Sequence, residues 1–173
     1  MDTGCFRLLR IDDASPHVDT LAGWAHGEWG HLHPGRELAA AVEAFRADCG
    51  PAGVPSVFAA MHDERPVGMA SLVVDDMSDR QDLTPWLASV YVRPEWRGRG
   101  IASRLVRRVE EEAQAHGHRR FYLYTPDQQA LYRRLGWKDL EDRRYRGEAV
   151  TKMRDMPRTF SAGKDSAGAV GAL

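Results

Sequence analysis

The spacing of hydrophobic and polar residues changes several times along this chain, and each change marks the boundary of a predicted element. Short apolar or alternating runs predict strands at residues 6–11, 56–61, 67–74, 86–93, 120–124, 137–141 and 148–153. Apolar positions three or four residues apart predict helices at residues 16–25, 36–49, 101–116 and 128–135. The resulting order, β-α-α-β-β-β-α-β-α-β-β, describes one mixed α/β domain.

Local signals refine several of these boundaries. Ser15 followed by Pro16 predicts an N-cap and a proline at the first helical position. Asp127 precedes the last predicted helix and is expected to cap it. Gly68 interrupts a predicted strand, which indicates a bulge or a close backbone neighbour.

The strongest signal lies at residues 90–113, which predict a strand, a glycine loop and a helix. Pro94 ends the strand because proline has no N–H to donate to a ladder. The loop contains Gly98 and Gly100, which let the backbone approach a ligand closely. The first turn of the helix then presents unpaired N–H groups with partial positive charge. Together these features predict a seat for a phosphate or a pyrophosphate.

The helix after this loop has an apolar residue every four positions and a charged opposite side. Two i, i+4 ion pairs are expected on that exposed side, Arg107 with Glu111 and Arg108 with Glu112.

Two common phosphate motifs do not fit the loop. The Walker pattern needs Lys-Ser/Thr after its last glycine, and the dinucleotide fingerprint needs a third glycine. The spacing Arg-x-x-Gly-x-Ala does fit, with Arg97, Gly100 and Ala102. This motif resembles the acyl-CoA pyrophosphate loop of the GNAT N-acetyltransferase superfamily.

A second motif supports the same resemblance. Residues 127–137 are similar to the Asn-x-x-Ala-x-x-x-Tyr-x-x-x-Gly-Phe segment of that superfamily, although Asp127 replaces its asparagine. The resemblance covers residues 6–154 and implies the GNAT fold. That fold is a mixed sheet of six to seven strands with four flanking helices and two splayed parallel strands that bind acyl-CoA. The predicted domain is residues 1–155, followed by a flexible tail at residues 156–173.

The resemblance also implies acetyl-CoA as the cofactor and assigns residues to it. The strand backbone at Val90, Tyr91 and Val92 would hold the pantetheine arm, with a further contact from Asp127. The residues expected around the pyrophosphate are Arg97, Gly98, Arg99, Gly100, Ile101 and Ala102. Tyr132 is the candidate general acid for the departing thiolate, because a phenol keeps its proton at neutral pH.

The general base is left open between several groups. Glu28, Asp76 and Asp82 are carboxylates that could accept a proton from the attacking amine, directly or through water. A chain of waters without a single base is an alternative.

The acceptor is expected to meet acidic and aromatic side chains. In this superfamily the connection between the first two helices and the loop before the central strand shape the acceptor pocket. Carboxylates pair with ammonium groups, and aromatic faces bind sugar rings or cations. The candidate residues are Trp24, Glu28, Trp29, Asp75, Asp76, Asp79, Asp82 and Trp86.

These residues predict a polycationic small-molecule amine, such as an aminoglycoside antibiotic. The segment Glu28-Trp29-Gly30 is also similar to an early segment of some aminoglycoside 6′-N-acetyltransferases. One alternative is acetylation of peptides or protein N-termini, since residues 123–136 resemble a branch that acetylates acidic N-termini. Another is a non-catalytic module that binds acyl-CoA.

Composition adds a few exclusions. A net charge of −1 over 173 residues gives no reason to expect nucleic acid or a membrane surface as partner. Cys5 and Cys49 are expected to be free thiols, and no secretory signal is recognised, so a cytoplasmic location is predicted. His31 and His33 lack the further ligands of a metal site. A homodimer is compatible with the family resemblance.

Overall fold

The computed structural model describes residues 5–154, with residues 148–154 described by their backbone alone. The tail predicted at residues 156–173 lies outside the described residues. The strands are β1 (Arg7–Ile11), β2 (Ser56–His62), β3 (Arg65–Val73), β4 (Trp86–Val92), β5 (Tyr122–Thr125), β6 (Lys138–Tyr145) and β7 (Glu148–Arg154). The helices are α1 (Val18–Trp29), α2 (Leu38–Ala47), α3 (Ile101–Ala115) and α4 (Gln129–Arg134), with short 3₁₀ turns η1 (Gly30–Leu32) and η2 (Pro94–Trp96).

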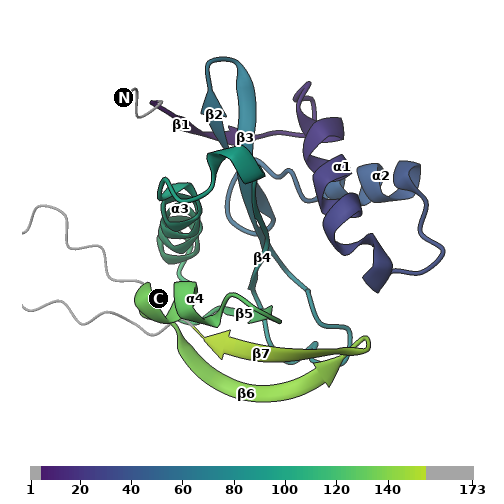
Figure 1. The fold of residues 1–173 in the computed structure, drawn as a ribbon, viewed down its shortest axis with the longest axis vertical. Coiled ribbons are helices and arrows are strands. Elements are labelled where there is room, and N and C mark those ends of the chain that lie inside the picture. Colours follow the sequence, from purple (N-terminus) through teal and green to yellow (C-terminus); the bar gives the residue numbers. More distant parts are fainter. Residues whose placement is uncertain (1–4, 155–173) are drawn as a thin grey trace, which may run out of the picture.

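The predicted element order is confirmed. All seven strands form one mixed sheet in the order β1-β2-β3-β4-β5-β7-β6, in which β4 and β5 are the parallel neighbours. Figure 1 shows α3 on one face of the sheet and α1 with α2 on the other. No helix in the described part of the chain is long and apolar enough to cross a membrane.

Strand β2, which lies between β1 and β3, explains this layering. Its apolar run is unbroken because both of its faces are buried. Phe58 and Ala60 pack in the cluster that includes α3, whereas Val57 and Ala59 pack in the cluster that includes α1 and α2. Alternate side chains of one strand therefore join the two halves of the core.

Gly68 has a close backbone neighbour, as its position in the strand indicated. A Cβ atom there would lie 3.0 Å from the carbonyl oxygen of Tyr91 and 3.2 Å from side-chain atoms of both Ile101 and Leu105. The register of β2 against β3 also shifts beside this residue. The glycine thus lets the first turns of α3, at Ile101 and Leu105, pack directly onto β3.

Several helix boundaries differ from the prediction. Helix α1 begins at Val18, and Ser15 Oγ accepts the N–H of His17 at 3.2 Å in the turn before the helix. The helix also continues to Trp29, whose ring packs against the α1–α2 core cluster. Asp127 does not cap α4, since Thr125 Oγ1 accepts the backbone N–H of Gln128 at 3.0 Å instead.

The ion pairs of α3 also differ from the expectation. Arg108 does pair with Glu112 at 3.0 Å, but this glutamate is buried rather than exposed. Arg107 pairs with Glu110 at 2.6 Å and not with Glu111. Glu110 turns inward because Trp137 Nε1 donates to its carboxylate at 3.1 Å. Contacts with distant residues, Trp137 for Glu110 and Gly53 for Glu112, thus turn these two glutamates inward, which helical spacing alone did not predict.

Candidate active site

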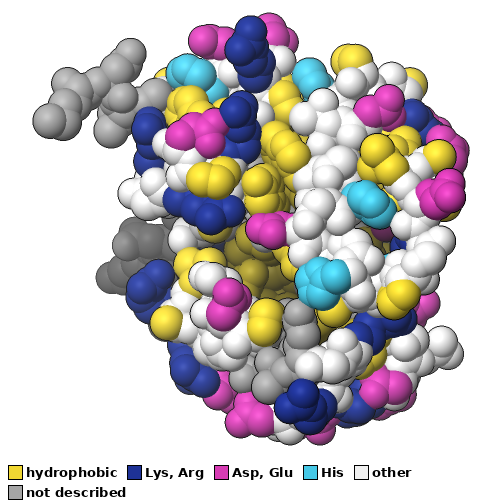
Figure 2. All heavy atoms as spheres, turned by 45° about the vertical axis from the view of Figure 1, so that its right-hand side comes forward, with side chains coloured by type: hydrophobic (Ala, Val, Ile, Leu, Met, Phe, Trp, Pro, Cys, Tyr) yellow, Lys and Arg dark blue, Asp and Glu magenta, His cyan; other side chains and the backbone are white. Residues whose placement is uncertain are grey.

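Separation of β4 from β5 creates the main cleft of the molecule. In the described part of the chain, their aligned pair is Trp86 with Tyr122, and the N–H of Tyr122 donates to the oxygen of Pro85 at 3.1 Å. Residues 87–92 and 123–128 then line a cleft of about 1000 Å³. Figure 2 shows a hollow with hydrophobic side chains in its depth and charged and histidine side chains around its rim. A cleft of this size suits a small-molecule ligand.

A bulge redirects β4 beside this cleft. The register of β3 against β4 shifts so that two residues of β4, Ser89 and Val90, stand opposite one residue of β3. Ser89 adopts a left-handed backbone conformation, with φ of 54°. Bulges commonly re-aim neighbouring groups next to active sites. Here the redirected segment includes Val90, Tyr91 and Val92, which all line the cleft.

The glycine loop adjoins the same cleft. Gly98 and Gly100 have φ angles of 74° and 78°, a region that residues with a side chain rarely adopt. Helix α3 starts at Ile101 without a side-chain cap, so the N–H groups of its first turn are available to an anion. The loop residues that line the cleft are Arg97, Gly98, Gly100, Ile101 and Ala102.

The two loop arginines lie differently. Arg97 lines the cleft, its Nε donates to the oxygen of Val92 at 2.8 Å, and its guanidinium lies 5.6 Å from the ring centroid of Tyr91. Arg99 lies over the ring of Trp96 at 4.6 Å and is not among the residues lining the cleft. The geometry therefore supports Arg97 as an anion-binding residue better than Arg99.

We expect Gly100→Ala to raise the KM for acetyl-CoA about tenfold, because a left-handed conformation costs an L-residue roughly 1–2 kcal/mol. Steady-state kinetics with varied acetyl-CoA measures this effect. Gly23→Ala is the matched control, since Gly23 lies in α1 with open space around its Cβ position and does not line the cleft. An unchanged KM in Gly100→Ala would contradict the assignment of this loop.

Helix α4 places Tyr132 in the cleft wall. The side chain is buried, and its ring packs edge-on against Trp137 with a centroid distance of 6.0 Å. Burial, and secondly the negative charge of Asp127, raises the pKa of the Tyr132 phenol above its ordinary value. The phenol therefore keeps its proton at neutral pH, as a proton donor requires. Asp127 itself is exposed and also lines the cleft.

Four of the predicted acceptor residues line the other end of the cleft. Glu28 and Trp29 come from the end of α1, and Asp75 and Asp76 come from the loop that follows β3. The sequence prediction missed Asp48, which ends α2 and lines the cleft beside them. A signal was present, because a carboxylate at a helix C-terminus is disfavoured by the helix dipole and calls for another explanation.

The carboxylates Asp48 and Asp76 have altered proton affinities. Burial, with a second contribution from the charge of Asp48, raises the pKa of Asp76 to about 7. Burial raises the pKa of Asp48 to about 6. Both carboxylates can therefore take up or release a proton near neutral pH, which suits the deprotonation of an amine.

Trp86 does not contact an acceptor, so that prediction is wrong. The side chain is 0% exposed and is absent from the cleft wall. Its ring packs against Tyr122 and Tyr124, with centroid distances of 5.7 Å and 6.3 Å, and its Nε1 donates to the oxygen of Leu83 at 2.7 Å. The aromatic residue that begins β4 therefore packs in the core.

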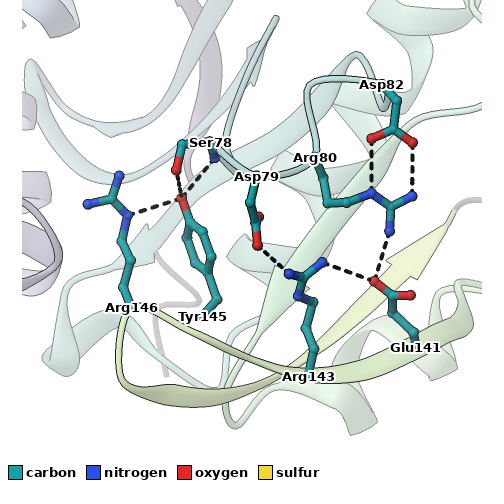
Figure 3. Close-up of polar contacts among 8 residues, drawn as sticks. All are labelled: Ser78, Asp79, Arg80, Asp82, Glu141, Arg143, Tyr145 and Arg146. Carbon is teal, nitrogen blue, oxygen red and sulfur yellow. Dashed lines mark hydrogen bonds and ion pairs between the residues drawn. The ribbon is translucent and has the colours of Figure 1, made fainter.

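Two aspartates of the predicted acidic loop are not among the residues that line the cleft, and both are paired with arginines (Figure 3). Asp82 accepts two hydrogen bonds of 2.9 Å from Arg80, and Asp79 pairs with Arg143 of β6. These pairs engage the carboxylates, so the structure does not support Asp82 as the base or either residue as an acceptor contact. Trp24 stacks against Tyr91 at 5.2 Å and supports the wall without lining it.

Several cleft residues were not predicted from the sequence. The hydroxyl of Tyr145 accepts the N–H of Ser78 at 2.9 Å and the Nε–H of Arg146 at 3.0 Å (Figure 3). His33 also lines the cleft, and burial, followed by the charges of Arg36 and Arg146, lowers its pKa. No local pattern distinguished Tyr145, Ser78 or Arg146. Within residues 5–147, no group of three or more His, Cys, Asp or Glu side chains could hold a metal ion.

Comparison with known proteins gives one family. Residues 18–137 match the model of the acetyltransferase (GNAT) family. Among curated proteins, thialysine N-epsilon-acetyltransferase from Sus scrofa is 35% identical over 78 residues, which cover 39% of this chain and 46% of that protein. The same enzyme from Bos taurus is 33% identical over 78 residues, with the same coverage of both chains. The matched segment thus spans about half the length of these relatives.

Solved structures share the fold at low sequence identity. An aminoglycoside 6′-acetyltransferase of type Ii has a TM-score of 0.67 and 19% identity, and the match covers 88% of this chain and 99% of that one. The yncA protein of Salmonella typhimurium, solved with its cofactor acetyl-CoA, has a TM-score of 0.66 and 18% identity over 92% of this chain and 98% of its own. At these identities the likeness describes the fold alone.

Proposed function

Because this chain belongs to the GNAT family of acetyltransferases, we propose that it transfers an acetyl group from acetyl-CoA directly to a primary amine of a small polycationic molecule. The observation that carries the proposal is a single cleft with a glycine loop and helix N-terminus at one end and carboxylates at the other. The first end suits a pyrophosphate, and the second end suits an ammonium group. The fold matches a structure that holds acetyl-CoA.

In the proposed reaction the amine nitrogen attacks the thioester carbon, and the carbon–sulfur bond breaks. The leaving thiolate takes the proton of Tyr132, which lies in the cleft wall and is protonated at neutral pH. The proton that the nitrogen releases as the amide forms then restores the phenol through solvent. The attacking amine must first lose a proton, and we assign its acceptor as Asp76, directly or through water. Glu28, which is exposed at the mouth, would attract the cationic substrate rather than act as base.

We propose an aminoglycoside as the acceptor class. Glu28, Asp48, Asp75 and Asp76 line the acceptor end, and carboxylates bind ammonium groups. Trp29 lines the same end and offers an aromatic face to a sugar ring or a cation. The curated relatives are named for thialysine, which is likewise a small molecule with a primary amine. Thialysine therefore belongs in the same acceptor panel.

The test is release of free CoA thiol from acetyl-CoA with a panel of aminoglycosides, polyamines, thialysine and short peptides. Turnover with aminoglycosides above all other amines is the expected result. Turnover with peptides alone would replace this proposal with peptide or protein N-terminal acetylation. Binding of acetyl-CoA without turnover of any amine would favour a binding module.

Asp76→Asn tests the proposed base through its pH dependence. The raised pKa means that Asp76 is protonated, and inactive as a base, below about pH 7. We therefore expect the kcat/KM of the wild type to decrease as the pH is lowered below about 7. In Asp76→Asn we expect this pH dependence to disappear and kcat to decrease about 10²-fold.

Asp75→Asn is the matched control, because Asp75 is an exposed carboxylate that also lines the cleft. A pH limb that survives in Asp76→Asn would assign the proton transfer to another group, such as Asp48 or a chain of waters.

We propose the cytoplasm as the site of this reaction. Cys5 and Cys49 are free thiols, which a reducing compartment maintains. Burial raises the pKa of the Cys49 thiol to about 12, so this cysteine is inert at neutral pH. A homodimer stays a prediction, for which size-exclusion chromatography with light scattering is the direct measurement.

A further inference from the structure

The turn between β6 and β7 reaches across to the connection between α1 and α2. Arg146 lies in this turn, and its Nη1 donates to the carbonyl oxygen of Leu32 in η1 at 2.6 Å. Its Nε donates to the hydroxyl of Tyr145 at 3.0 Å, and its guanidinium lies 5.3 Å from the centroid of that ring. Hydrogen bonds from a charged donor at these distances are among the stronger ones in proteins. Two segments far apart in the sequence are therefore held together by one side chain.

The same turn is also fixed to the loop that precedes β4 (Figure 3). The N–H of Ser78 donates to the Tyr145 hydroxyl at 2.9 Å, and Asp79 pairs with Arg143. Tyr145 is only 6% exposed, and its ring packs edge-on against Tyr124 of β5 at 5.3 Å. These contacts hold the end of the hairpin against β5 and the loop before β4, and Arg146 follows directly after Tyr145.

An arginine at this position is unusual for the turn that carries it. Residues 146 and 147 connect β6 to β7, and Arg146 and Gly147 have φ angles of 49° and 84°. Two consecutive positive φ values describe a type I′ turn, which favours asparagine, aspartate or glycine at its first position. The hydrogen bonds of the Arg146 side chain offset this unfavourable backbone conformation, which points to a role for the side chain.

These contacts meet at the acceptor end of the cleft. Leu32, Ser78, Tyr145 and Arg146 all line it, together with the carboxylates Asp48 and Asp76. They come from η1, from the loop before β4 and from the β6–β7 hairpin. Hydrogen bonds thus join the three segments at the acceptor end of the cleft.

We infer that Arg146 is a specificity-determining residue that closes the acceptor end of the cleft, so that small amines are admitted and polypeptide chains are excluded. An extended peptide advances about 3.3 Å with each residue. A peptide of several residues is therefore longer than the acceptor end and would have to extend out of the cleft there, whereas a small amine would not. The part of this inference that concerns selectivity rests on the proposed acetyl transfer. The closure itself can be measured without any substrate.

The first experiment compares hydrogen exchange in the wild-type protein, Arg146→Ala and Arg144→Ala. Arg144→Ala is the matched control, because Arg144 is an exposed arginine of the same hairpin that donates to the oxygen of Gly147 and not to η1. We expect the amides of residues 30–37 to exchange about tenfold faster in Arg146→Ala, the factor expected for loss of one charged hydrogen bond. Equal exchange in all three proteins would overturn the closure.

The second experiment measures kcat/KM for two acceptors, the best small amine of the panel and a ten-residue peptide with a free N-terminal amine. We expect the small-amine to peptide ratio to fall about tenfold in Arg146→Ala and to stay unchanged in Arg144→Ala. Arg146→Lys keeps the charge but not the two-point contact, so its ratio should lie between them. An unchanged ratio in Arg146→Ala would overturn the selectivity.

The two experiments separate this inference from the proposed function. If the wild-type protein acetylates no amine, the proposed function is wrong and the selectivity is wrong with it, while hydrogen exchange still decides the closure. If the wild-type protein uses the peptide as well as the small amine, acetyl transfer stands and the inference about Arg146 is wrong.

Discussion

Tyr132→Phe is expected to lower kcat by about 10²–10³-fold while the KM for acetyl-CoA stays within a factor of two, because loss of a general acid acts on the chemical step. The phenol lies in the cleft wall and is protonated at neutral pH. Phenylalanine keeps the ring that packs against Trp137, so folding is preserved. Steady-state kinetics with the best acceptor of the panel measures the effect.

Tyr122→Phe is the control for removing a hydroxyl from a nearby tyrosine. Tyr122 packs against Trp86 in the core and does not line the cleft, so its kcat should match that of the wild type. A thioester with a more acidic leaving thiol should restore part of the lost rate in Tyr132→Phe, since such a thiol departs without help. Retention of more than half of the wild-type kcat would remove Tyr132 from the mechanism.

Glu112→Ala is expected to lower the free energy of unfolding by about 3 kcal/mol, because it leaves two half-buried arginines, Arg10 and Arg108, without their counter-charge. Glu112 Oε1 lies 2.6 Å from Arg10 Nη2 and accepts the N–H of Gly53 at 2.8 Å. Its Oε2 accepts a hydrogen bond of 3.0 Å from Arg108. The glutamate side chain is 6% exposed, so these contacts are poorly screened by solvent. Urea denaturation followed by circular dichroism measures the loss.

Glu111→Ala is the matched control, because it removes an exposed glutamate from the same helix and should change stability by less than about 0.5 kcal/mol. Glu112→Gln should be intermediate, since it keeps a hydrogen-bond acceptor and loses the charge. A loss below about 1 kcal/mol in Glu112→Ala would show that the cluster contributes little net stability.

The stability from Glu112 should also depend on pH. Burial alone would raise the pKa of this carboxyl, but the hydrogen bonds from Gly53, Arg10 and Arg108 outweigh it and lower the pKa to about 2. A lowered folded-state pKa contributes stability above the unfolded value near 4.5, which is lost as the pH falls toward 2. The difference between the wild type and Glu112→Gln should therefore shrink across that range.

From the sequence alone, the order of the elements and the position of the glycine loop between β4 and α3 could be predicted. Both depend on short-range properties, namely the period of apolar residues and the backbone freedom of Gly98 and Gly100. Tyr132 could be placed for the same reason, because a motif that matches over a dozen residues fixes a position on one helix. Helix boundaries were less accurate, as at Val18, because capping depends on side-chain contacts within single turns.

The tertiary structure alone decided which charges face the acceptor. Four aspartates looked equivalent in the loop before β4, but β6 brings Arg143 to Asp79, and Arg80 joins Asp82 with Glu141. Asp76 stays in the cleft, beside an Asp48 supplied by another helix. The solvation and charge environment of a carboxylate come from its spatial neighbours, and sequence spacing carries no information about neighbours on distant elements.

The same limit explains the error at Trp86 and the absence of any prediction for Arg146. An aromatic residue at the start of a strand can face solvent or the core with the same local pattern, and the packing of Tyr122 and Tyr124 buries Trp86. Arg146 stands in a hairpin turn far along the chain from Leu32, and the sheet order β4-β5-β7-β6 brings that turn back to the cleft. The sequence thus predicted the glycine loop beside the cleft, whereas the long-range pairing of strands decided which charged side chains line the rest of the cleft, because these arise from contacts between distant segments.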